Sequence, residues 1–218
     1  MSALATTAAA AAPERPVIVL YRDDGPMARV VGRALGRRLR IPAPVLVVGG
    51  ALPLVAVLAV EGDSSHAALG AAVAWLVVLA GISGGGPHTG RLDWTSAPLL
   101  RGVEYGTLVS FAALYSDAAV PACFALLCAL AFRHYDAVYR QRHQGTAAAA
   151  WLRDLGGGWD GRLILAYVLL VTGALTAGLY VAAVLLAAAS VAESVASWLR
   201  FSRAQRPAMY ADEEDEEE

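Results

Sequence analysis

Charged residues inside otherwise apolar stretches are the residues of this sequence best suited to chemistry. Glu193 is the one charged residue between Leu163 and Leu199, and Arg101 and Glu104 interrupt another apolar stretch upstream. A charged side chain surrounded by lipid is costly unless it is paired or has a function. Carboxylates can bind a divalent cation through oxygen, and arginines can bind phosphate. These residues therefore mark a candidate site.

The candidate cavity collects the polar residues that lie near the same end of the predicted helices. Helical spacing places Ser190, Glu193, Ser194 and Ser197 on one face, and Asp93, Ala97, Arg101, Glu104 and Tyr105 on a similar stripe. We expect these two helices to face each other across a polar, water-accessible cavity. The candidate residues are Asp93, Arg101, Glu104, Arg133, His134, Asp136, Asp160, Arg162 and Glu193.

Two roles are open for these residues. In the first, Arg101, Arg133 and Arg162 clamp phosphates, and at least three of the five carboxylates converge on a divalent cation or a shared arginine network. In the second, the charges only hold helices together. Arg101 and Glu104 would then pair at a spacing of three residues, and Glu193 would bond to Arg162 or Arg133.

The length of the apolar segment shows that these residues belong to a membrane protein. Residues 163–199 would extend roughly 55 Å as one helix, whereas the hydrocarbon core of a bilayer is about 30 Å thick. The segment must therefore fold back, and we place the turn near Gly178-Leu179-Tyr180. The whole chain is 57% hydrophobic, with a mean hydropathy of +0.52 and only 17% charged residues. The predicted class is an all-α polytopic membrane protein.

Hydropathy predicts six spans and two flanking regions. Four spans cover about residues 43–60, 67–83, 97–115 and 118–132, and the last two divide 163–199. The predicted organisation is a disordered or linker-like arm (1–25), an amphipathic interfacial helix (26–41), the membrane domain (43–200) and a disordered acidic tail (201–218).

The distribution of arginine predicts the orientation. Arginine occurs before the first span, in the second and fourth connections and after the sixth span, whereas the other connections contain none. Positively charged loops remain on the cytosolic side of a membrane. We therefore expect a multi-pass protein of a bacterial cytoplasmic membrane with both termini in the cytosol.

The architecture resembles that of the CDP-alcohol phosphotransferases. Those enzymes carry Asp-x-x-Asp-Gly-x-x-Ala-Arg followed by Gly-x-x-x-Asp-x-x-x-Asp, and the resemblance implies that such acids bind divalent metal and activate an alcohol. Here the motif is degenerate. Gly90-Arg91-Leu92-Asp93 looks like the start of the second half, but Ala97 stands where the last Asp would fall. A partial match to the first half, residues 24–29, precedes the first span.

A closer similarity is to an uncharacterised family of actinobacterial membrane domains. It covers about residues 16–201, and it brings no known activity. It is carried by five short strings: Arg22-Asp23-Asp24-Gly25-Pro26, Arg91-Leu92-Asp93-Trp94, Glu104-Tyr105-Gly106, His134-Tyr135-Asp136 and Trp159-Asp160-Gly161-Arg162.

Two functions remain open from the sequence. The first is a degenerate phosphotransferase-like module that binds a phosphate-bearing lipid or nucleotide, with a divalent cation as its cofactor. The second is a non-catalytic membrane anchor or scaffold for cell-envelope or lipid metabolism. The expected partners are the lipid bilayer and such a phosphate-bearing ligand. A homodimer is left open, and no nucleic-acid partner is expected.

Overall fold

The computed structural model describes residues 21–36, 38–39, 41–60, 65–86, 90–143 and 149–214. The described part is all-α, as predicted. Short 3-10 turns at Asp93–Thr95 and Asp117–Ala119 precede two of the helices. The helices are α2 (Pro26–Val31, continued by a π-helical segment, Gly32–Gly36), α3 (Ala43–Ala59), α4 (His66–Gly84), α5 (Ser96–Tyr115), α6 (Val120–His143), α7 (Ala150–Leu155), α8 (Gly158–Val171) and α9 (Leu175–Glu214).

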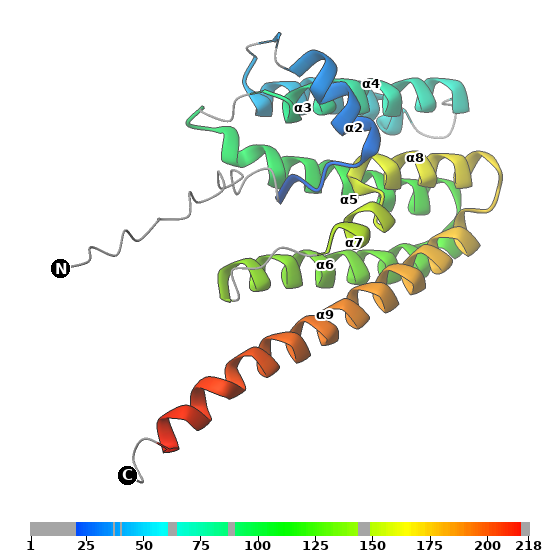
Figure 1. Cartoon of the computed structure of the whole chain (residues 1–218). Helices are drawn as coiled ribbons and strands as arrows, with labels where there is room; N and C mark the ends of the chain where they lie inside the picture. Colours follow the sequence, from blue (N-terminus) through cyan, green and yellow to red (C-terminus); the bar gives the residue numbers. More distant parts are fainter. Residues whose placement is uncertain are drawn as a thin grey trace.

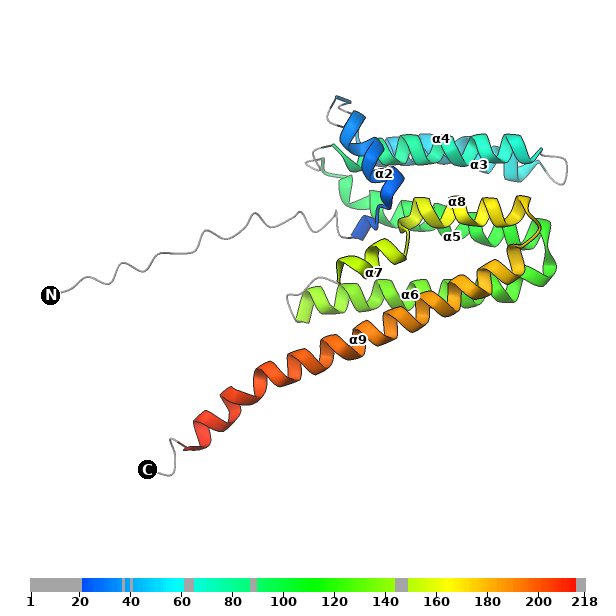
Figure 2. The ribbon, with the colours of Figure 1, turned by 45° about the vertical axis from the view of Figure 1, so that its right-hand side comes forward.

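The long helices form three layers, antiparallel within the first and parallel within the other two (Figures 1 and 2). One layer is the α3–α4 hairpin, the middle layer is α5 with α8, and the third is α6 with α9. The stripe of α5 therefore packs toward α8, and α9 lies along α6. The expectation that α5 and α9 would face each other across a cavity was wrong in this respect.

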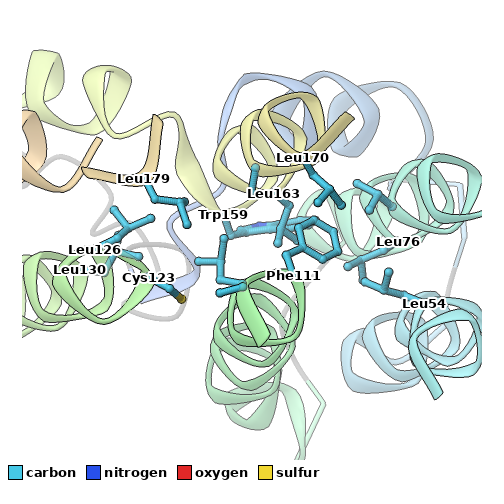
Figure 3. Close-up of a cluster of buried hydrophobic side chains, with 14 of the residues drawn as sticks. Leu54, Leu76, Phe111, Cys123, Leu126, Leu130, Trp159, Leu163, Leu170 and Leu179 are labelled. Carbon is cyan, nitrogen blue, oxygen red and sulfur yellow. The ribbon is translucent and has the colours of Figure 1, made fainter. Parts of the chain in front are cut away.

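Aromatic residues of the middle layer form the centre of the apolar core. Trp159 of α8 and Phe111 of α5 are completely buried. Figure 3 shows them between leucines of α3 and α4, such as Leu76, on one side and leucines of α6 and α9, such as Leu126, on the other. The core therefore extends through all three layers, and the middle layer joins the outer two.

Three helices are long and apolar enough to cross a membrane, whereas six spans were predicted. They cover His66–Gly84, Asp117–Arg142 and Leu175–Arg203, within the described residues. Helix α3 has only 17 residues, and α8 has only 14. Helix α5 is long enough, but Arg101 and Glu104 lower its hydropathy. Hydropathy thus placed a helix in each of the six predicted segments but overstated the number of candidate spans.

The turn between the last two helices lies earlier than predicted. Helix α8 ends at Val171 and α9 begins at Leu175, with Gly173 in the left-handed conformation at φ 72°. Glycine adopts this conformation without steric cost. The predicted turn residue Gly178 is instead helical, and it provides room for the Leu169 side chain where α8 and α9 cross.

The predicted amphipathic helix is shorter than expected and packs against protein. It ends at Gly36 instead of residue 41. Its small residues Ala28, Gly32 and Gly36 are buried. A Cβ atom on Gly85 of the α4 C-cap would overlap with the Gly32 carbonyl. The small residues thus allow close helix packing, while the apolar side chain of Val30 and the charged side chain of Arg29 remain exposed.

Helix α9 extends into the segment that was predicted to be disordered from residue 201. Its backbone is helical to Glu214, and residues 215–218 lie outside the described part. Adding residues to an existing helix avoids the cost of nucleation. Residues 201–214 also include several alanine, arginine and glutamate residues, which favour helix.

Candidate functional site

Asp23 lies at the centre of a buried cluster of arginines from three different helices. Its Oδ1 accepts a hydrogen bond from Nη2 of Arg133 on α6, at 3.1 Å. Its Oδ2 accepts one from Nη1 of Arg162 on α8, at 3.0 Å. Nη2 of Arg101 on α5 is 3.8 Å from the same oxygen. These three arginines are the ones predicted to clamp phosphate, so a carboxylate of the chain itself occupies them.

Glu104 supplies the second carboxylate of the cluster. It is completely buried. It accepts hydrogen bonds from Nε of Arg162 at 2.5 Å and from Nη1 of Arg101 at 2.9 Å. The predicted pairing of Arg101 with Glu104 is therefore present. Together with Asp23 and Arg133, the five side chains carry three positive and two negative charges, which leaves one positive charge in excess.

His134 and Tyr105 border the same cluster. Nε2 of His134 is 3.6 Å from Oδ2 of Asp23, and its Nδ1 shares a hydrogen bond of 2.8 Å with the Tyr105 hydroxyl. The two rings also stack, with centroids 6.3 Å apart. These contacts bring the predicted site residue His134 into the cluster.

The electrostatic surroundings keep Asp23 ionised. Burial by itself would raise the pKa of Asp23, but the nearby His134 ring and the charges of Arg162, Arg133 and Arg101 outweigh it. The net pKa lies well below the usual range for Asp. The backbone of Asp23 has φ 51°. This left-handed conformation is uncommon outside glycine but is tolerated by Asp. The fold therefore holds an unusual backbone turn in place to present this carboxylate.

The neighbours of Asp23 attach the same segment to other helices. Buried Arg22 donates to Asp24 at 3.1 Å and to the carbonyl oxygen of Ala80 on α4 at 2.8 Å. The indole N–H of Trp159 donates to Asp24 at 2.8 Å. Residues 21–25 were predicted to belong to a disordered arm. This part of the prediction was wrong, whereas residues 1–20 lie outside the described part.

Asp160 stabilises the start of α2. Its two carboxylate oxygens accept hydrogen bonds from the backbone N–H groups of Gly25, at 2.6 Å, and Ala28, at 2.9 Å. N–H groups in the first turn of a helix have no partner within the helix, so a carboxylate there is favourable. Burial nevertheless raises the pKa of Asp160, and these backbone hydrogen bonds only partly offset the effect.

Glycines bring the two chain segments into direct contact. A Cβ atom on Gly25 would overlap with the carbonyl oxygen of Gly157. Gly157 and Gly158 both have positive φ, 65° and 68°. The N–H of Trp159 donates to the carbonyl oxygen of Asp23 at 3.1 Å. The close approach and the positive φ angles together explain why glycine occupies positions 25, 157 and 158.

Asp136 and Glu193 form a separate cluster that joins α6 to α9. Arg140 donates to Asp136 from two of its nitrogens, and to Glu193 at 3.3 Å. Arg200 donates to Glu193 at 3.0 Å, and the Ser194 hydroxyl donates to Asp136 at 2.9 Å. Glu193 therefore holds helices together, which is the second of the two roles predicted for the candidate residues. Its partners are Arg140 and Arg200, instead of Arg162 or Arg133.

The nine candidate residues do not form one metal site. Asp93 accepts a hydrogen bond from the N–H of Gly90 in its own turn, at 2.7 Å. In the described part of the chain, no group of three or more His, Cys, Asp or Glu side chains is placed to hold a metal ion. The predicted convergence of at least three of the five carboxylates on one ion or one arginine network is therefore not met, because Glu104 belongs to the first cluster and Asp136 and Glu193 belong to the second. The structure does bring together five predicted residues: Arg101, Glu104, Arg133, His134 and Arg162.

The sequence-based site missed its central residue. Asp23 lies in a short polar segment without helical periodicity, and its partners are 78 to 139 residues away. The available signal was the string Arg22-Asp23-Asp24-Gly25-Pro26, which carried part of the family resemblance but was not included among the site residues. Arg140 was also missed, although it lies one helical turn after Asp136.

Comparison with known proteins identifies the family but no activity. No curated protein and no solved structure matches the chain. The model of a family of unknown function (DUF5941) matches residues 15–216. This match confirms an uncharacterised family over most of the chain and provides no link to the CDP-alcohol phosphotransferases. The protein therefore belongs to the DUF5941 family.

Proposed function

We propose that this protein is a non-catalytic integral membrane module that acts as an anchor or scaffold in the cell envelope or in lipid metabolism. One observation carries the proposal. The carboxylate of Asp23 lies among the three guanidinium groups that were predicted to clamp the phosphate of a ligand. An internal carboxylate thus already bonds to Arg133 and Arg162.

The distribution of the other carboxylates supports the same proposal. Metal-dependent phosphoryl transfer needs several carboxylates around shared cations. Glu104 is bonded to Arg101 and Arg162, and Asp160 is bonded to the start of α2. Each of these acids already has a structural partner. Their arrangement favours a structural role, in which the carboxylates hold helices together, over a catalytic centre.

The segment of residues 22–25 would have a structural role in the proposed module. Residues 22–25 contact α4, α5, α6 and α8 through Arg22, Asp23 and Asp24. A scaffold needs a rigid attachment between its membrane helices and the chain that precedes them. We propose that this segment provides the attachment.

The membrane orientation is part of the proposal. The turns at Asp117–Ala119 and 172–174 lie at one end of the helix layers, and α2 and α7 lie at the other (Figures 1 and 2). Arg29 lies on α2, Arg91 in the connection from α4 to α5, and Arg200 in the half of α9 that points away from the turn 172–174. Positively charged segments favour the cytosolic side. We therefore place this end in the cytosol of a bacterial cell.

A thermal-shift experiment tests the non-catalytic proposal. The purified protein in detergent would be heated with CDP or CTP, with and without Mg²⁺ or Mn²⁺. We expect an unchanged unfolding temperature, because the arginines are occupied and the carboxylates are dispersed. A stabilisation by nucleotide that requires the cation and disappears in Arg133→Gln would overturn the proposal.

A proteolysis experiment tests the attachment. Trypsin should leave the bond after buried Arg22 intact in the native protein. Asp23→Asn should expose this bond, whereas Asp154→Asn should not, because Asp154 forms only an exposed pair with Arg29. Equal cleavage after Arg22 in the wild type and in Asp23→Asn would contradict a locked segment.

A further inference from the structure

An apolar groove lies between α8 and α9. The two helices meet at the turn 172–174 and diverge toward their other ends, as both views show (Figures 1 and 2). Side chains of α6 and α7 complete a cavity of about 210 Å³ between them. Apart from Arg162, every residue that lines it is Gly, Ala or Leu. An aqueous metabolite would find few hydrogen-bonding partners there.

The shape of the groove fits an extended hydrocarbon chain. Its lining runs along α8 from Gly157 to Leu169, which corresponds to about 18 Å of helix. Leu165 and Leu185 belong to the lining and are 47% and 57% exposed. The groove is therefore open to the side. Because α9 is a candidate membrane span, that side would face the lipid.

One end of the groove is positively charged. Arg162 lines this end, and its Nη1 donates to the carbonyl oxygen of Gly156 at 2.9 Å. A Cβ atom on Gly156 would overlap with the guanidinium of Arg133, so this arginine lies directly behind the groove wall. The cluster carries one positive charge in excess. Within the described part, Nη2 of Arg162 has no hydrogen-bond partner.

We propose that this groove binds one anionic phospholipid. An acyl chain lies along α8 among the leucines, and the phosphate of the headgroup lies at the Gly156–Gly157 end, where Arg162 and the N-terminus of α8 favour negative charge. The charge excess of the cluster selects an anionic headgroup over a zwitterionic one. The inference rests on the membrane location in the proposed function and adds a specific ligand class to it.

Photocrosslinking tests the ligand class. The wild-type protein would be placed in phosphatidylcholine vesicles that contain a phosphatidylglycerol with a photoreactive group near the end of one acyl chain. We expect crosslinks in peptides of α8 and α9, mapped by mass spectrometry. Unlabelled phosphatidylglycerol should compete for the site, whereas added phosphatidylcholine should not.

A pair of glycine variants tests the location. A Cβ atom on Gly161, which lines the groove, meets no atom within 4 Å, so Gly161→Leu places a side chain in the groove without a backbone clash. Gly102 on α5 is equally unobstructed and does not line the groove. We expect Gly161→Leu to reduce crosslinking about tenfold or more, which equals a loss of about 1.4 kcal/mol in binding. Gly102→Leu should remain at the wild-type level.

Three results would overturn the inference. They are equal crosslinking of Gly161→Leu and Gly102→Leu, equal competition by the two lipids, and crosslinking that falls as protein density in the vesicle rises. The last result would mean that a second copy of the chain fills the groove. The lipid competition uses the wild type, so it decides the matter even if a variant fails to fold. Extraction of the protein by alkaline carbonate would instead refute the membrane location itself.

Discussion

Replacing Asp23 with Asn removes the charge at the centre of the arginine cluster while it preserves the shape of the side chain. The carboxylate is 3.1 Å from Arg133, 3.0 Å from Arg162 and 3.8 Å from Arg101. At an effective dielectric constant of about 20, each contact contributes about 4 to 6 kcal/mol of attraction. Much of this attraction offsets the cost of burying the charges. We therefore expect a net loss of about 3–5 kcal/mol in the free energy of unfolding.

The unfolding temperature provides the assay. For a chain of this size, the expected loss corresponds to a decrease of roughly 6–20 °C. The fluorescence of the tryptophans, including buried Trp159, would report unfolding in detergent. Asp154→Asn is the matched control, because Asp154 and its partner Arg29 are 64% and 45% exposed. An exposed pair contributes less than about 1 kcal/mol.

A compensating variant makes the prediction more specific. Arg101 is the most exposed of the three arginines, at 16%. Adding Arg101→Gln to Asp23→Asn restores the excess of one positive charge, so the double variant should recover part of the lost stability. Asp23→Asn melting within about 1 °C of the wild type, well under 1 kcal/mol, would refute the reasoning. A double variant less stable than Asp23→Asn alone would also refute it.

The pH dependence gives an independent check. The folded protein holds the pKa of Asp23 below its usual value. Its contribution to stability is therefore present at neutral pH and is lost as the pH falls below the unfolded value of about 3.9 toward the folded one. The stability difference between the wild type and Asp23→Asn should be constant above about pH 5 and should shrink in acid.

Three further predictions concern the same fold. Gly25→Ala should lower the unfolding temperature because its Cβ would overlap with a carbonyl oxygen of the loop before α8, whereas Gly106→Ala, whose Cβ meets no atom within 4 Å, should be neutral or stabilising by up to about 1 kcal/mol. Asp160→Asn should cost about 1–2 kcal/mol, since an amide cannot accept both N–H groups. The raised pKa of Asp160 gives the opposite pH dependence to Asp23, so the wild type should gain stability relative to Asp160→Asn as the pH falls. In a cysteine-free background, an impermeant reagent added to intact cells should label Asp117→Cys but not Ser202→Cys, and the reverse pattern would invert the orientation.

The sequence predicted the helices well because apolar composition is a local property. The first three apolar stretches became helices close to the predicted bounds, α5 at Ser96–Tyr115 for example, whereas α6 and α9 extend beyond theirs. The turn between α8 and α9 was misplaced because Gly173 and Gly178 are equally small. Their roles differ only through a tertiary contact with Leu169. The contact between Gly178 and Leu169 cannot be predicted from local composition.

The candidate site was predicted only in part, because local patterns predict contacts within one helix but not contacts between distant segments. Arg101 and Glu104 are three residues apart on one helix, so periodicity alone predicts that they pair. Asp23 pairs with Arg162 across 139 residues, and no periodic pattern connects a short polar segment to a distant helix. The sequence therefore identified the three arginines of this cluster. It could not identify the carboxylate that satisfies them.

The contact between residues 22–25 and the start of α8 constrains the order in which the protein can assemble. Chains are synthesised from the N-terminus, and domains usually begin to fold in that direction. Here the earliest described segment must wait for Asp160 and Arg162, which emerge 135 or more residues later. Until then, Arg133 on α6 has no docked carboxylate to bind. Docking of this segment thus reports that α8 has formed, and a chain that stalls before α8 leaves Arg133 unpaired, which quality-control proteases could recognise.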